Sequence, residues 1–160
     1  MACDYRGQAQ INLWGNGPSL NGSKVIKGDE WRWVLQISDY ELTNAVVQFT
    51  AKCDIETPDE NAEVVADSKT TSTTLGRIVL TSSSHVNLIY AEIIIPTEVT
   101  SAIIFPFDKS ELMLYFDVRI QRAATATSAR KVQTYFRGNN ARFTVGKPVT
   151  NIVPALPIIP

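Results

Sequence analysis

The sequence predicts an all-β domain, specifically an immunoglobulin-like β-sandwich of about seven strands with extended N- and C-terminal arms. Three observations predict this fold class. Short apolar segments alternate with polar residues at a period of two, the pattern of half-buried strands. These segments recur at roughly regular spacing with turn residues between them. Helical periodicity is almost absent from the 160 residues, a length that suggests one domain with a real core.

The first strands of the predicted sandwich lie in "VIKGDEWRWVLQI" and "AVVQFTAKCDI". After a turn or kink at residues 28–29, large apolar side chains share one face of the strand: Trp31, Trp33, Leu35 and Ile37. The next strand places Val47, Phe49 and Ala51 on one side and polar residues on the other. This alternation predicts that both strands have one face in the core.

Residues 54–75 follow, acidic at first and then rich in Ser and Thr, and they predict a long loop or flexible excursion. "GRIVLT" and "YAEIIIPT" are short and β-branched, which favours strands. The next segment has room for one helical turn, capped by Thr97 or Thr100, because Pro106 excludes anything longer.

The strongest strand is "ELMLYFDVRIQRA", in which Leu114, Phe116, Val118 and Ile120 share one face. A small-residue connection leads to "KVQTYFRG" and "ARFTV", two short strands around Gly138. The pattern predicts a core that contains Trp33, Phe49, Phe116, Val118 and Phe143.

Three segments divide the chain. Residues 1–23 are polar and turn-rich, with "INLW" as a short strand or anchored part of an N-terminal arm. Residues 24–151 hold the sandwich. Residues 152–160 form an extended, proline-rich C-terminal arm, since Pro154, Pro157 and Pro160 block helix and inner strand.

Composition excludes several classes of partner. The formal net charge of −1 argues against a general hold on nucleic acid or on an acidic membrane. The sequence contains no apolar run of 18 residues and no apolar signal core near its start, so we expect neither a membrane span nor secretion by that route. Cys3 and Cys53 do not make a disulfide framework, and we expect free thiols made in a reducing compartment.

No catalytic or metal-binding set is predicted, and no cofactor. His85 is the single histidine, and the serines beside it belong to the same loop, so a catalytic arrangement with a base held by a third group is not expected. Asp54, Glu56, Asp59 and Glu60 supply oxygen atoms at short spacing, but the pattern matches no EF-hand. We interpret this acidic cluster as a solvated loop.

Charge and aromatic residues leave two interpretations open. The last third of the chain is basic and includes Arg119, Arg137 and Arg142, whereas residues 54–67 are acidic. These are either solvated strand faces or complementary patches that fix the register between copies. Trp31 and Trp33 are expected in the core. A carbohydrate-binding module would instead expose such aromatics, and Trp14 with Tyr5 would join them.

The last residues suggest a contact with another chain. Val153, Leu156, Ile158 and Ile159 are large aliphatics between prolines, poorly placed in water. An extended arm in a neighbour's groove would bury them, and a disordered tail is the alternative. With Trp14 and the three arginines above, they complete the residues that we expect in protein contacts.

The order of several motifs resembles a known family. "KGDEWRWVLQI", "YELTNAVVQFTAK", "AEIIIPTEVTSAI", "LYFDVRIQ" and "KVQTYFRGNNARFTVGKPVTN" resemble, in that order, segments of small β-sandwich proteins of tailed bacteriophages. The family includes the amino-terminal domain of phage baseplate upper proteins and related tail or fibre-attachment proteins. The resemblance covers roughly residues 24–151, and the arm at 1–23 and the long insertion depart from it.

The resemblance implies a function without catalysis. We expect a structural component of a tailed-phage particle, made in the host cytoplasm and located in the virion. It would assemble in symmetric copies as a homo-oligomer and bridge other phage structural proteins of the tail, baseplate, fibre attachment or capsid. The alternative is a carbohydrate- or receptor-binding β-sandwich module.

Overall fold

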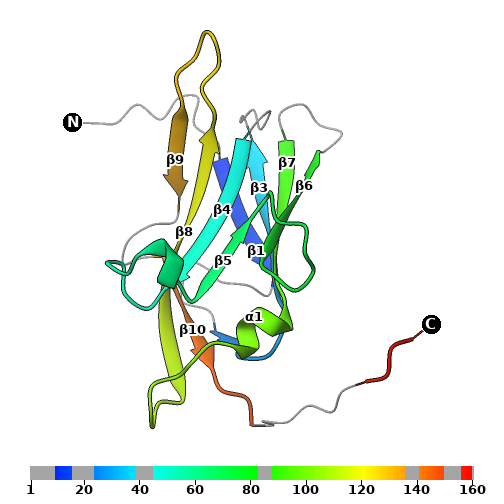
Figure 1. Ribbon diagram of the computed structural model, residues 1–160, viewed down its shortest axis with the longest axis vertical. Helices are drawn as coiled ribbons and strands as arrows, with labels where there is room; N and C mark the ends of the chain where they lie inside the picture. The colour runs from blue at the N-terminus through cyan, green and yellow to red at the C-terminus, as the bar shows by residue number, and fades with distance from the viewer. Residues whose placement is uncertain are drawn as a thin grey trace.

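The computed structural model describes residues 10–15, 24–38, 45–82, 88–135, 141–149 and 156–159. Within these ranges ten strands carry the fold, with one short helix and one 3-10 turn (Figure 1). The strands are β1 (Gln10–Gly15), β2 (Lys24–Ile26), β3 (Trp31–Ser38), β4 (Ala45–Lys52), β5 (Val64–Asp67), β6 (Arg77–Ser82), β7 (Leu88–Ile95), β8 (Glu111–Arg122), β9 (Lys131–Tyr135) and β10 (Arg142–Gly146). The 3-10 turn η1 spans Asp59–Asn61 and the helix α1 spans Thr97–Ser101.

The strands form two layers. Their hydrogen-bonded order is β1-β3-β7-β6-β5-β4-β8-β10-β2, and β9 pairs with β8. β5 and β6 are joined by a single pair, Asp67 with Arg77, and the path folds over at this point. The rings of Trp33 on β3 and Phe49 on β4 lie 4.7 Å apart, although three strands separate β3 from β4 along the path. The two halves of the path therefore pack face to face.

The connectivity is that of an immunoglobulin-like sandwich. One layer is β1-β3-β7-β6, which corresponds to strands A, B, E and D of that fold when the strands are lettered along the chain. The other layer is β5-β4-β8-β10, which matches C′, C, F and G, and β2 pairs in parallel with β10 at its edge. The chain is an all-β, immunoglobulin-like sandwich, as the sequence predicts.

The core consists of the inward faces that alternation predicts. Trp33, Phe49, Phe116, Val118 and Phe143 are all buried. Phe49 lies at the centre, 5.7 Å from the ring of Phe116 and closer to Trp33. Phe143 contacts Phe116 at 5.8 Å and Trp31 at 5.7 Å. Aromatic packing between the layers thus occupies the centre of the sandwich. Cys53 lies outside this core as an exposed, free cysteine.

Three local predictions need correction. Residues 54–75 are not one loop, because Val64–Asp67 form β5 with Val64 and Ala66 buried. Residues 10–15 form β1, which agrees with the short strand offered for "INLW". This strand pairs with β3 along its length, so it belongs to the sheet and not to an arm. The helix α1 has Pro96 at its N-cap and no side-chain cap, so neither Thr97 nor Thr100 caps it.

The closing strand is interrupted, as the prediction of two strands around Gly138 requires. Val118 pairs with Tyr135, so an unbroken ladder would place residue 138 opposite Tyr115. Tyr115 instead pairs with Arg142. The chain between the two paired segments therefore contains four more residues than an unbroken strand would need. β9 and β10 therefore pair with the two halves of one strand, β8. The hairpin that joins β8 to β9 extends beyond the sandwich (Figure 1).

Thr100 joins α1 to the turn that precedes β3. Its hydroxyl donates to the carbonyl oxygen of Asp29 at 2.7 Å and accepts from the N–H of Gly28 at 3.2 Å. Gly28 has a φ of 94°, a conformation that suits glycine. Thr100 is fully buried, so the hydroxyl replaces water for both backbone groups.

Replacing Thr100 with valine should lower the free energy of unfolding by about 1–3 kcal/mol, because it leaves two backbone groups without a partner. Urea denaturation measures the change. Thr97→Val, at an exposed position of the same helix, is the matched control. A loss below about 0.5 kcal/mol for Thr100→Val would show that water satisfies these groups.

Candidate functional site

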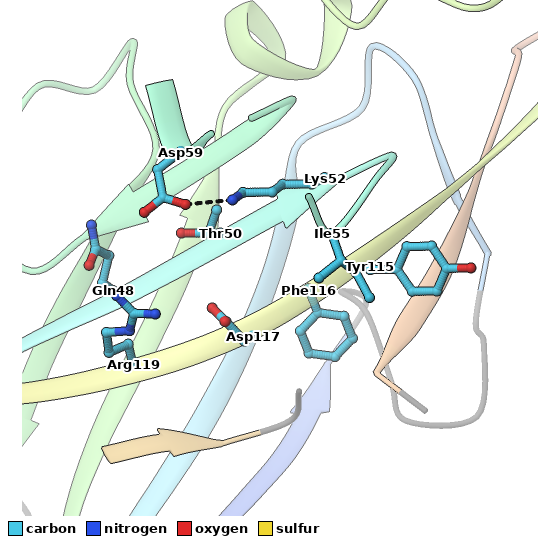
Figure 2. A pocket seen from close by; sticks show the side chains of 9 residues that line it. All are labelled: Gln48, Thr50, Lys52, Ile55, Asp59, Tyr115, Phe116, Asp117 and Arg119. Atoms are coloured by element: carbon cyan, nitrogen blue, oxygen red, sulfur yellow. Dashed lines mark ion pairs between the residues drawn. The ribbon is translucent and has the colours of Figure 1, made fainter. Parts of the chain in front are cut away.

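A cavity of about 240 Å³ lies on the outer face of β4 and β8. The same alternation that sends Phe49 and Val118 inward sends their neighbours outward. Directly opposite pairs across the two strands line the cavity: Gln48 with Arg119, Thr50 with Asp117, and Lys52 with Tyr115. Figure 2 shows Asp117 and Arg119 reaching into the same space from β8.

The turn after β4 closes one side of the cavity. Ile55 and Asp59 line it from this turn. Lys52 Nζ lies 2.6 Å from Asp59 Oδ1 and donates to the carbonyl oxygen of Thr57 (Figure 2). The hydrogen bond from Lys52 lowers the pKa of Asp59, which therefore stays ionised. Lys52 thus holds the turn over the sheet.

Asp117 and Arg119 are the groups at the floor of the cavity. Burial raises the pKa of Asp117, and the nearby charge of Arg119 opposes that rise. Arg119 Nε is buried and, among the residues described, has no hydrogen-bond partner. A buried donor without a partner is costly, so a ligand acceptor at this position would be favoured.

The cavity suits a neutral, hydroxyl-rich ligand. Two cations, Lys52 and Arg119, and two carboxylates, Asp59 and Asp117, balance its charge. A hydroxyl group both donates and accepts, so one ligand can satisfy Asp117 and Arg119 together. Ile55 and the ring of Tyr115 add an apolar wall. No Ser, Cys or His lines the cavity, so its described residues offer none of the usual pairs of nucleophile and histidine base.

Cys53 lies beside this site at the end of β4. Partial burial of its sulfur and the neighbouring Glu63 carboxylate raise the pKa of Cys53 to about 12. Glu63 also accepts a hydrogen bond from the Cys53 N–H at 2.9 Å. The thiol therefore stays protonated near neutral pH, which makes it a poor nucleophile.

In a Cys3→Ser background, iodoacetamide should alkylate Cys53 at pH 8 at least about tenfold more slowly than in the urea-unfolded chain, because an ordinary thiol ionises near pH 8.5. Glu63→Gln removes one cause of the raised pKa and should speed the reaction. Mass spectrometry of timed samples gives both rates. Equal rates in the folded and unfolded chains would contradict the raised pKa.

The structure places some of the predicted contact residues. Trp14 lies on β1, where its backbone pairs with Val34. Arg119 lines the cavity of its own chain, whereas Arg142 is exposed on β10. Leu156, Ile158 and Ile159 are exposed. Arg137 and Val153 lie outside the described residues, as do Cys3, Tyr5 and His85. The role of all eight residues in protein contacts stays a prediction.

The described carboxylates of the acidic cluster are not arranged as a metal-binding site. Within the ranges that the structure describes, no three His, Cys, Asp or Glu side chains gather closely enough to bind an ion. The Asp54 carboxylate instead accepts a hydrogen bond from the N–H of Glu56 at 3.0 Å, and Asp59 pairs with Lys52. These carboxylates shape the turn that borders the cavity.

Sequence reasoning did not find the cavity residues. Alternation predicts only that Gln48, Thr50, Lys52 and Asp117 lie on the polar faces of their strands. Register is the missing information, since a shift of two residues would pair different side chains across β4 and β8. The sequence signal that could have indicated the cavity is the presence of ionisable residues on the outward faces of "QFTAK" and "YFDVR".

Comparisons with known proteins give two negative results and one distant structural similarity. No protein-family model matches the chain, and no curated protein matches it. A solved structure of a marsupial T cell receptor is similar, with a TM-score of 0.43 and 12% identity. That match covers 92% of this chain and 37% of the receptor chain, so this chain spans just over a third of its length. In the described part of the chain, no helix has the length and hydropathy to span a membrane.

Proposed function

We propose that the protein is a non-enzymatic structural component of a tailed-phage particle, which assembles in symmetric copies and bridges other structural chains. The order of the sequence motifs supports the class of particle. The structural observation that carries the proposal is a set of large, exposed apolar side chains at one end of the sandwich and in the C-terminal segment.

The C-terminal segment provides the clearest case. Leu156, Ile158 and Ile159 are 86%, 96% and 88% exposed. Transfer of each such side chain out of water is worth about 1.5–3 kcal/mol. Pro157 restricts the backbone between them, so less conformational entropy is lost when the segment docks. These properties support an arm that binds along a neighbouring chain.

A second set of exposed apolar residues lies where α1 leads into β8. Phe107 is 95% exposed, and Ile104 and Val149 are also exposed. The N–H of Lys147 donates to the carbonyl oxygen of Ser110, which ties the end of β10 to this connection. The α1–β8 connection and the end of β10 lie at the same end of the sandwich (Figure 1). Several exposed apolar groups at one end favour an interface with another chain.

Quantitative mass spectrometry of purified particles tests the proposal. The particles should contain the chain at a constant number of copies relative to the major structural proteins, and the chain should stay with them through density-gradient purification and a high-salt wash. Absence of the chain from gradient-purified particles, with the chain present in the producing cells, would overturn it.

Carbohydrate binding is a second candidate function, and the cavity between Lys52, Asp117 and Arg119 favours it. Its balanced charge and paired donors and acceptors suit the hydroxyl groups of a sugar. An NMR titration with neutral monosaccharides should shift the amide signals of β4 and β8, and Asp117→Asn with Arg119→Met should abolish these shifts. Unchanged spectra at about 50 mM sugar, far above a mM dissociation constant, would exclude this candidate.

A further inference from the structure

A basic groove of about 630 Å³ lies where β4 begins and β8 ends, at the base of the hairpin that joins β8 to β9. Lys69, Arg122 and Arg130 line it, and none of its described lining residues is acidic. Small apolar side chains make up part of the lining, namely Ala45, Ala123 and Ala124. The groove therefore combines an apolar surface with three positive charges.

The hairpin that borders the groove is built by its own hydrogen bonds. Arg130 Nη2 donates to Gln121 Oε1 at 2.7 Å, which holds the guanidinium beside β8. Thr125 closes the connection, since its N–H donates to the Ser128 carbonyl oxygen at 2.8 Å. The positive charge of Arg130 is thus positioned before any partner binds, which reduces the entropy lost on binding.

The acidic turn, residues 54–60, carries a charge opposite to that of the basic groove. Asp54, Glu56 and Glu60 are exposed, and Ile55 is half exposed between two of these acidic residues. The turn is held in shape by the Asp54–Glu56 hydrogen bond and by the Lys52–Asp59 ion pair. It presents one apolar side chain flanked by carboxylates, to match an apolar surface flanked by cations.

The groove and the acidic turn lie at opposite ends of one strand. β4 begins at Ala45, which lines the groove, and ends at Lys52, just before the turn. Eight strand residues span about 23 Å, too far for the two features to meet within one chain. A second copy can bring its turn to the groove, and the same contact can then repeat.

We propose that the basic groove binds the acidic turn of a second copy, head to tail. This contact rests on the proposed function, in which the chain assembles in symmetric copies. The groove and the turn would form one of the contacts between neighbouring copies. Such a contact is heterologous, so repetition closes a ring or extends a filament. Charge complementarity sets the register between copies and speeds their encounter.

Complementary charge reversal tests the proposal on the full-length chain. One variant, K69E/R130E, reverses the groove, and the other, E56K/E60K, reverses the turn while keeping its internal contacts. Analytical ultracentrifugation at about 20 mM salt should show that the wild-type mass rises with concentration and falls back at about 0.5 M salt. Each variant alone should associate at least about tenfold more weakly.

Mixing the two variants should restore association to within about threefold of wild type, because each reversed groove then meets a reversed turn. Lys24→Glu, a charge reversal at an exposed position of β2 outside the groove, should leave association unchanged. A wild-type chain that stays monomeric at every concentration, variants that associate normally, or a mixture without recovery would overturn the groove as the contact. The particle measurement above is independent, so the proposed function can survive that result.

Discussion

Phe49→Ala should lower the free energy of unfolding by about 3–5 kcal/mol, because truncation of a fully buried phenylalanine removes its packing and leaves a cavity. Phe49 is the residue at which the two layers meet, with Trp33 on one side and Phe116 on the other. The neighbouring rings cannot fill the space, since each is held by further core contacts.

Chemical denaturation monitored by tryptophan fluorescence measures this loss. The matched control is Val65→Ala on β5, the strand next to β4, where the side chain is exposed and the expected loss is below about 1 kcal/mol. If Phe49→Ala costs no more than this control, the centre of the interface between the layers has been wrongly placed.

Deletion of residues 152–160 should abolish incorporation into particles while leaving the sandwich folded. The ladder ends with Gly146 on β10, and Pro148 has no N–H to extend it. The exposed Leu156, Ile158 and Ile159 contribute nothing to the core, so the truncated chain should melt cooperatively within about 3 °C of wild type. Calorimetry and mass spectrometry of particles give the two readouts.

Leu75→Ser controls for the loss of exposed aliphatic surface. Leu75 is also exposed, but it lies in the connection between β5 and β6. Particles should incorporate this variant normally. If they also incorporate the truncated chain at the wild-type level, the tail makes no required contact and that part of the proposal is wrong.

The sequence predicted the inward faces of the strands well, because alternation is a local property. Trp31, Trp33, Leu35 and Ile37 share a buried face, and so do Leu114, Phe116, Val118 and Ile120. A β-strand with one face in the core must repeat at a period of two, and this repeat is visible without knowing the strand's partner.

Other features depend on partners distant in the sequence. β5 has only four residues within a largely polar segment, too few to show alternation before β4 lies beside it. The sequence offers Thr97 or Thr100 as the cap of one helical turn. The buried hydroxyl of Thr100 instead bonds to residues 28 and 29, which are about 70 positions away. The cavity likewise exists only because β4 and β8 pair in one register.

A cryo-EM reconstruction of the intact particle tests the central claim most directly. The account predicts symmetric copies of the sandwich in the density, with Leu156, Ile158 and Ile159 covered by a neighbouring chain. A well-resolved particle in which no density fits the sandwich, or in which these side chains face solvent in every copy, would contradict it.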